Sequence, residues 1–147
     1  MKIYYLFLFL FFYLLLACID GVEVELWEQC YDIEETLVLD LSGTQISGLI
    51  PEKIGDLENL IELNLSLNNL EGQIPSQIGN LTNLTILNLS LNDLSGEIPS
   101  SLNNLVNLNF LDLNNNNLSN DIPSQIGNLT NLVTLNLYSN QLEGEIP

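Results

Sequence analysis

Apolar and polar residues follow a period of 24 residues over most of the chain. An Ile-Pro dipeptide and five columns of Leu or Ile all keep this spacing without insertion. The dipeptides are Ile50-Pro51, Ile74-Pro75, Ile98-Pro99, Ile122-Pro123 and Ile146-Pro147, and the columns begin at Leu39, Leu41, Ile46, Ile54 and Leu57. Because so many positions share one spacing, the pattern indicates an internal structural repeat.

Within one repeat, the pattern predicts a short strand, a bend and a return segment. Leu63 and Leu65 are two residues apart, so both point inward from a strand while Asn64 points outward. Gly72 permits a tight bend, and Pro75 ends a second extended piece. The return side has apolar residues at a spacing of three, as in 3₁₀ turns, at Ile78, Leu81 and Leu84. A single repeat buries too little apolar surface to fold alone, so we expect the repeats to stack as a solenoid.

An asparagine stands three residues after the second strand leucine in four repeats, at Asn68, Asn92, Asn116 and Asn140. An Asn at this bend can turn inward and hydrogen-bond backbone groups of its own and the neighbouring coil. Each such bond is worth about 1 kcal/mol net. We therefore expect a structural asparagine ladder. The first repeat has Thr44 here, whose shorter side chain predicts a terminal coil with less strict geometry.

These positions together match a known motif. The pattern Leu60-x-x-Leu63-x-Leu65-x-x-Asn68-x-Leu70-x-Gly72-x-Ile74-Pro75-x-x-Ile78-Gly79-x-Leu81 closely resembles the plant-type leucine-rich repeat, over residues 36–147. The resemblance implies an α/β solenoid, a right-handed superhelical arc with a parallel β-sheet on its concave face and 3₁₀ or irregular structure on its convex side. The same repeat occurs in receptor-kinase ectodomains, secreted inhibitors and microbial surface proteins, so it implies the fold more strongly than the function.

Two positions depart from the motif. Asn103 replaces the glycine found at Gly55, Gly79 and Gly127, and Asn120 replaces the one found at Gly48, Gly72, Gly96 and Gly144. Asn tolerates a left-handed backbone better than most residues, so we expect the bend at Asn120 to be kept.

The two ends of the chain predict different things. Residues 1–17, with Lys2 before a 14-residue apolar run, are typical of an export signal, either of simple secretion or of a lipoprotein, with a retained anchor helix as the third alternative. Residues 18–35 predict an acidic N-terminal cap in which Trp27 covers the open end of the first coil. No closing cap precedes Pro147, so we expect this sequence to be part of a longer array.

The two cysteines leave two alternatives open. Cys18 and Cys30 can form one disulfide in an exported chain. The stretch Leu15-Leu16-Ala17-Cys18 also resembles a lipobox, in which Cys18 would carry lipid and Cys30 would stay unpaired.

Composition excludes several functions. The chain has 19 acidic residues, two Lys and no His or Arg, with a formal charge of −17. Nucleic-acid binding and electrostatic attachment to an anionic membrane both need cationic groups, so neither is expected. Zinc sites and catalytic triads that need His are excluded as well, and the acidic cap lacks the loop spacing of a calcium motif. We expect no metal and no cofactor, and membrane association only through lipid at Cys18 or a further segment of the chain.

The outward strand positions vary between repeats, unlike the core columns, and variation of this kind is where binding specificity can reside. We predict a binding surface on the concave face, formed by Glu62, Asn64, Leu67, Ile86, Asn88, Leu91, Phe110, Asp112, Asn114 and Tyr138. Its exposed apolar members are a candidate contact patch. The expected partner is a protein or a glycan. A structural or adhesive surface protein and the ectodomain of a receptor-like kinase are the alternatives.

Catalysis is not expected. Asp40 and Asp112 share a column but lie three coils apart, about 14 Å at strand spacing, beyond the range of about 5–9.5 Å that glycosidase carboxylates use. Asn-x-Ser/Thr triplets at Asn64 and Asn88 are potential glycan acceptors, and a glycan there would obstruct the concave sheet.

Overall fold

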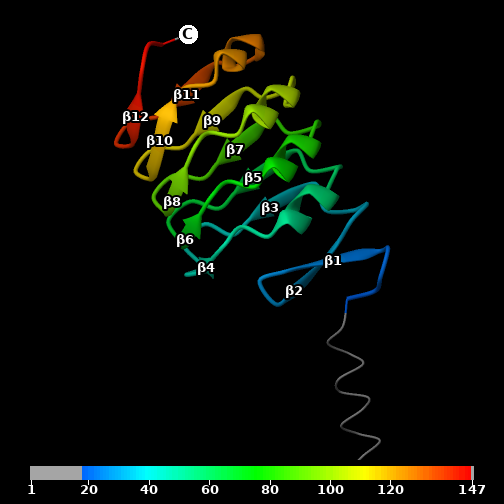
Figure 1. The fold of residues 1–147 in the computed structure, drawn as a ribbon. Helices are drawn as coiled ribbons and strands as arrows, with labels where there is room; N and C mark the ends of the chain where they lie inside the picture. Colours follow the sequence, from blue (N-terminus) through cyan, green and yellow to red (C-terminus); the bar gives the residue numbers. More distant parts are fainter. Residues whose placement is uncertain (1–17, 147) are drawn as a thin grey trace, which may run out of the picture.

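A computed structural model describes residues 18–146. The expected export signal, residues 1–17, lies outside these residues. The described chain begins with a hairpin and continues as coils stacked one on the next (Figure 1). The predicted solenoid is therefore confirmed.

Two parallel sheets run through the stack. The first contains β3 (Val38–Asp40), β5 (Glu62–Asn64), β7 (Ile86–Asn88), β9 (Phe110–Asp112) and β11 (Thr134–Asn136). The second contains β4 (Ser47–Gly48), β6 (Asn69–Gly72), β8 (Asp93–Gly96), β10 (Asn117–Asp121) and β12 (Gln141–Glu143). In the first sheet every residue pairs with the one 24 positions away, as Leu39 does with Leu63, so the sequence period sets the strand register.

Short 3₁₀ helices form the return side of each coil (Figure 1). They are η1 (Glu52–Asp56), η2 (Ser76–Asn80), η3 (Ser100–Asn104) and η4 (Ser124–Asn128). A proline precedes each of them, with φ between −67° and −56°. Because proline already has this φ, it ends the second strand and begins the 3₁₀ turn at the same point of each coil.

The core is a column of leucine and isoleucine between the two sheets and the 3₁₀ helices. Leu63, Leu65, Leu87, Leu89, Leu111 and Leu113 are fully buried, as the two-residue spacing predicted. The asparagine side chains at the bends are buried with them in the central coils.

The N-terminal cap is an antiparallel hairpin of β1 (Glu23–Leu26) and β2 (Gln29–Asp32). Trp27, in its turn, packs against the core but stays partly exposed, as expected of a cover. Most of the covering is done by Val24 and Leu26, which are 3% and 0% exposed and which the sequence did not single out. A disulfide joins Cys18 to Cys30 across the segment, which is the first of the two alternatives that the cysteines left open.

The asparagine ladder connects each coil to the one before it. Asn92 Nδ2 lies 2.9 Å from the carbonyl oxygen of Leu65 in the preceding coil, and its Oδ1 accepts the N–H of Leu70 at 3.0 Å. The same amide also donates to carbonyls of its own bend, those of Leu89 and Ser90. Asn68, Asn116 and Asn140 repeat this pattern. Thr44 reaches only the carbonyl of Leu41 in its own coil, which agrees with the less strict geometry expected there.

A second asparagine ladder, which sequence reasoning missed, runs before the strands of the first sheet. Its members donate from Nδ2 to a carbonyl 25 residues earlier at 2.8–3.0 Å: Asn59, Asn83, Asn107 and Asn131. Both ladders satisfy backbone carbonyls that the strands and 3₁₀ helices leave unpaired, so each coil depends on its neighbour for polar as well as apolar contacts.

The two departures from the motif have different effects. Asn120 has a φ of 67°, close to the 74–81° of the glycines it replaces, so the bend is kept as expected. A Cβ added at Gly79 would lie 2.6 Å from the carbonyl oxygen of Ser101 in the next coil. Asn103 has a Cβ at this position, so η4 cannot approach η3 as closely as η3 approaches η2.

We predict that Asn68→Ala lowers the free energy of unfolding by about 3 kcal/mol, because it leaves buried backbone groups without partners. The matched control is Asn69→Ala, one residue later, where the side chain is exposed and the change removes the same atoms. Urea unfolding followed by circular dichroism measures both. Equal effects at the two positions would contradict a structural ladder.

We also predict that the double change Cys18→Ser and Cys30→Ser lowers the stability of the cap by about 2–3 kcal/mol, since the bond closes a loop of 12 residues. Guanidinium unfolding without reductant provides the measurement. No loss of stability would mean that Val24 and Leu26 hold the hairpin on the first coil by themselves.

Candidate functional site

The outward side of the first sheet, which we call the strand face, collects side chains from five coils. Glu62, Ile86, Phe110 and Thr134 are register partners, and so are Asn64, Asn88, Asp112 and Asn136. The strands therefore bring six of the ten predicted site residues into two adjacent rows, and the other four, Leu67, Leu91, Asn114 and Tyr138, lie beyond the strand ends. The rows exist because the period of 24 residues equals one coil.

The row from Asp40 to Asn136 is fixed by hydrogen bonds within each coil. The side-chain Oδ1 of Asn88 accepts the N–H of Ser90 at 3.1 Å and its hydroxyl at 2.7 Å. Asn64 binds Ser66 in the same way, and Asp112 accepts the N–H of Asn114 at 2.9 Å. These bonds hold the side chains in one rotamer, so the row presents a preordered set of polar groups.

The alternation of a strand would also point Ser66 and Ser90 outward, in one column with Asn114 and Tyr138, but both serines are buried. They are 6% and 4% exposed, because their hydroxyls turn back to bind Asn64 and Asn88. They support the row and do not contribute to its surface. At the same position in the next two coils, Asn114 is half-buried and Tyr138 is 78% exposed. These side chains are therefore accessible to a partner only toward the C-terminal end of the stack.

Asp40 begins the polar row at the N-terminal end. Hydrogen bonds from the backbone N–H and the hydroxyl of Ser42, together with one from Asn64, hold the pKa of its carboxyl below the ordinary value of 3.8. The carboxyl is exposed and stays charged at neutral pH, so this end of the strand face is negative.

Apolar residues lie on both sides of the polar row. Ile86 and Phe110 are paired across β7 and β9 and are half-buried, not fully exposed as the sequence suggested. Leu67 and Leu91 were expected on the sheet, but the strands end at residues 64 and 88 and both leucines lie in the turns that follow. Their side chains are 59% and 43% exposed.

The Asn-x-Ser/Thr triplets differ in what their asparagine amides contact. Asn64 and Asn88 accept hydrogen bonds from their own serines at Oδ1, which is not the atom that carries a glycan, whereas Nδ2 of Asn83 donates to the carbonyl of Glu58 at 3.0 Å. In contrast, Asn80 and Asn128 end η2 and η4 and are exposed away from the strand face. A glycan on these two would leave the strand face open.

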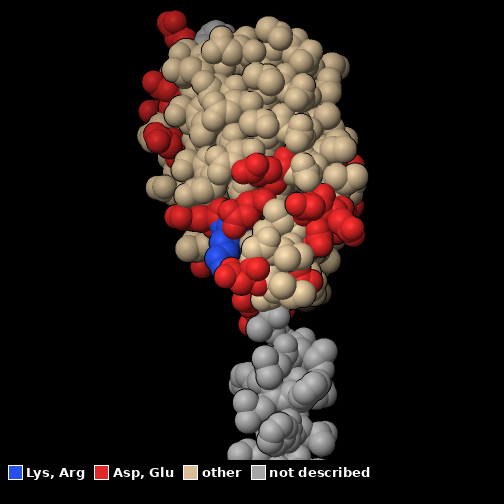
Figure 2. Space-filling model, turned by 90° about the vertical axis from the view of Figure 1, so that its right-hand side faces the viewer, with Lys and Arg blue, Asp and Glu red and all other residues tan. Residues whose placement is uncertain are grey.

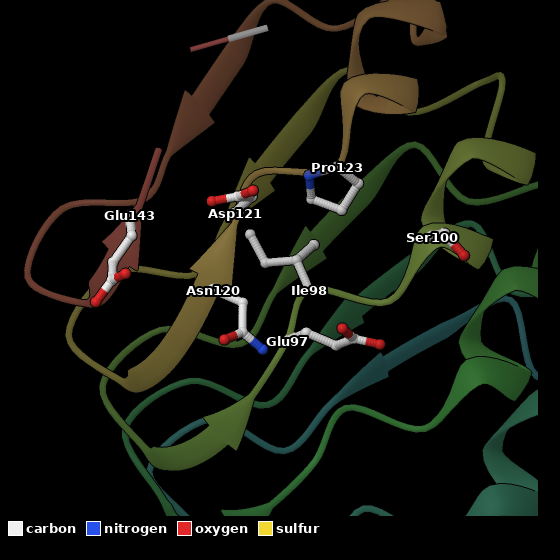
Figure 3. Close-up of a pocket in the computed structure, with 7 residues that line it drawn as sticks. All are labelled: Glu97, Ile98, Ser100, Asn120, Asp121, Pro123 and Glu143. Atoms are coloured by element: carbon white, nitrogen blue, oxygen red, sulfur yellow. The ribbon is translucent and has the colours of Figure 1, made fainter. Parts of the chain in front are cut away.

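The described residues are also hollowed on the side of the second sheet, which sequence reasoning did not anticipate. A hollow of about 510 Å³ is lined by Glu97, Ile98, Ser100, Asn120, Asp121, Pro123 and Glu143. Ile98 lies between the carboxylates of Asp121 and Glu97 in Figure 3, and Asn120 stands beside Glu97. A second hollow of about 510 Å³ lies on the same side of the stack, at the preceding coils, and its lining includes Leu49, Gln73 and Pro99.

Charge is unevenly distributed over the surface. On the side of the 3₁₀ helices, acidic side chains gather near the N-terminal end, and the coils above them carry few charges (Figure 2). Lys53, in η1, is the single cation of residues 18–146. Within the same residues no group of three or more His, Cys, Asp or Glu is placed to hold a metal ion. None of the helices in this part of the chain has the length and apolar character of a membrane span.

Comparison with known proteins identifies the repeat. Residues 37–143 match the family model described as a leucine-rich repeat region. No curated protein matches the chain. Among solved structures, the ectodomain of the Arabidopsis thaliana membrane receptor kinase GASSHO1/SCHENGEN3, in complex with CASPARIAN STRIP INTEGRITY FACTOR 2, is 39% identical over 75% of this chain and 13% of its own length, with a TM-score of 0.74.

Two further structures show the range of proteins with this fold. The Arabidopsis receptor kinase HAESA, in complex with the peptide hormone IDA and the co-receptor SERK1, is 47% identical over 74% of this chain, with a TM-score of 0.72. A plant ice-binding protein is 39% identical over 72% of this chain, with a TM-score of 0.69. The chain spans 13%, 18% and 34% of the length of these three neighbours.

The hydrogen bonds of Asp40 generate a prediction about acid stability. The pKa of the Asp40 carboxyl is lower in the folded chain than its ordinary value of 3.8. Its hydrogen bonds therefore stabilise the fold fully above pH 3.8, and this stabilisation is lost as the pH falls through the folded-state pKa. We expect Asp40→Asn, which keeps the acceptor oxygen, to flatten the acid limb of the stability curve. Carbon-detected NMR titration of the Asp40 carboxyl measures the pKa directly, and a value at or above 3.8 would contradict the assignment.

Proposed function

The chain belongs to the leucine-rich repeat family of the plant type, and from this premise we propose that it is a non-catalytic module that recognises another protein through its concave strand face. The partner binds across several coils at once. Glu62, Ile86 and Phe110 form one row of contacts, and Asn64, Asn88 and Asp112 form the other.

The contrast between the two sides of the same strands carries this proposal. Inward positions such as Leu63, Leu87 and Leu111 are identical and fully buried. The outward partners of the same coils are Glu62, Ile86 and Phe110, an acid, an aliphatic and an aromatic residue. Core packing restricts the inward positions to leucine, whereas the outward positions can vary without disturbing the core. The outward side chains are therefore available to contact a partner.

A rigid surface of this kind favours binding by preorganisation. The strands are held by backbone hydrogen bonds to both neighbours, and the row side chains are held by bonds to the following turn. Little conformational entropy is therefore lost when a partner docks. The structural neighbours GASSHO1/SCHENGEN3, solved with CASPARIAN STRIP INTEGRITY FACTOR 2, and HAESA, solved with the peptide hormone IDA, support a protein ligand over a glycan.

We place the module outside the cell. A structural disulfide persists in oxidising compartments, and the receptor ectodomains similar to this chain are extracellular. Cys18 is engaged in that disulfide, so lipid anchoring has no support from the described residues.

Two alternatives keep the same fold. One is the ectodomain of a receptor-like kinase, which the similarity to receptor ectodomains favours, and the other is a structural surface protein without a single ligand. The coding sequence downstream of Pro147 separates them. A membrane span followed by kinase motifs selects the receptor, and many near-identical repeats with a wall anchor select the adhesive protein.

We expect the double change Ile86→Asp and Phe110→Asp to weaken partner binding at least about tenfold, because it places charge in an apolar contact region. The probe is a phage-displayed library of random dodecapeptides selected on the full chain, and synthetic copies of the enriched peptides are then measured by calorimetry. Val106→Asp, in an exposed turn after η3, is the matched control. Circular dichroism checks the fold, and Glu62→Lys replaces the double variant if that variant unfolds. Peptides that bind the double variant and the wild type equally would reject the strand face.

A further inference from the structure

One backbone position turns through the left-handed region in every coil, immediately before the ladder asparagine or Thr44. The φ angles there lie between 51° and 65°, at Gly43, Leu67, Leu91, Asn115 and Ser139. The fold therefore imposes this conformation whatever the residue. Gly and Asn adopt it at low cost, whereas a leucine is strained by its Cβ.

Leu67 and Leu91 are therefore costly choices in two respects. Both sit in the strained conformation, and both keep much of their apolar side chain in water, at 59% and 43% exposure. The core does not need them, since Leu65 and Leu89 already fill the interior of these coils at 0% exposure. Strain held at an exposed apolar position is characteristic of a functional contact.

The two leucines are neighbours. The N–H of Leu67 donates to the carbonyl of Ser90 at 3.1 Å, and the carbonyl of Leu91 accepts the N–H of Asn68 at 3.2 Å. Adjacent coils in such a ladder are separated by about 4.8 Å. Their side chains can thus contact one apolar group of a ligand at the same time.

The surroundings of this pair indicate the chemistry of the ligand. Asp40, Glu62 and Asp112 lie on the same face, and the single cation of the described residues, Lys53, lies in η1 instead. Beside Leu91, Asn88 uses Oδ1 for Ser90, and within the described residues its Nδ2 has no hydrogen-bond partner. The face thus offers an apolar contact, a free amide donor and negative charge.

We propose that Leu67 and Leu91 are the specificity-determining anchor for a cationic peptide segment, and that they receive an aliphatic or aromatic side chain flanked by Lys or Arg. This inference rests on the proposed function and names the class of partner. Asn88 Nδ2 donates to a backbone carbonyl of the segment, and Asp40, Glu62 and Asp112 attract its cations. The leucines are kept for binding at the expense of stability.

The double change Leu67→Asn and Leu91→Asn tests the proposal, because its two readouts are expected to move in opposite directions. Relief of strain raises the thermal midpoint by about 2 °C or more. Loss of the apolar anchor weakens binding at least about tenfold for the dodecapeptides selected from the library. A purely structural role for the leucines predicts the reverse for stability, a lower midpoint. The matched control is Asn115→Leu, which introduces the strained leucine into the next coil and should lower the midpoint without strengthening binding.

The sequences of the selected peptides supply the second half of the test. We expect an aliphatic or aromatic residue next to Lys or Arg in most of them, and weaker binding when NaCl is raised from about 0.15 to 0.5 M, since salt screens the charged contacts. Peptides without this pattern, or equal affinity for the wild type and the double Asn variant, would overturn the proposal.

The strand-face variants separate this failure from that of the proposed function. If the Ile86→Asp and Phe110→Asp changes lower the peptide affinity and the Asn changes do not, recognition by the strand face is supported and the leucine anchor is rejected. Peptides that lose affinity only with the Asn changes support the leucine anchor and exclude Ile86 and Phe110 from the contact. A library that yields no peptide sensitive to either pair of changes rejects both.

Discussion

The structure depends on hydrogen bonds and apolar contacts that cross from each coil to the next. Asn68, Asn92, Asn116 and Asn140 each bind an N–H and a carbonyl of the preceding coil, and the strands of both sheets pair only between coils. A coil on its own would leave these groups unpaired and would expose leucines that the neighbouring coils cover. Stability therefore belongs to the stack and not to any repeat.

This dependence explains why the inward positions tolerate so little change. A buried asparagine that satisfies four backbone groups has no equivalent among the other side chains, and a shorter residue reaches fewer of them, as Thr44 shows at the first coil. The same register then places outward side chains in straight rows. Selection can act on those rows without disturbing the core, since Ile86 and Phe110 share a row with Glu62 and Thr134 at no cost to packing.

The irregular positions are as informative as the regular ones. Asn103 separates two 3₁₀ helices that glycine would allow to meet, and Asn120 lines one of the two hollows on the side of the second sheet. Leu67 and Leu91 occupy a backbone conformation that other coils give to Gly, Asn or Ser. Of these residues, Leu67 and Leu91 depart from what local structure prefers, and both are exposed, where a ligand can compensate for the cost.

The sequence by itself determined the solenoid, its period, the register of the first sheet, the buried leucines and the first asparagine ladder, because equivalent residues of successive coils lie 24 positions apart. The second sheet pairs residues 22 positions apart, which the period does not give. It also marked the strand face as the variable surface. Only the tertiary structure decided which outward residues are usable. Ser66 and Ser90 are withdrawn by hydrogen bonds to Asn64 and Asn88, and the left-handed turns bring Leu67 and Leu91 into exposed positions. The hairpin residues Val24 and Leu26 lie outside the repeats, so the period says nothing of their contact with the first coil. The second asparagine ladder, through Asn83, keeps the period of 24 residues and is visible as a column in the sequence, but only the tertiary structure shows that its amides bind carbonyls of the preceding coil.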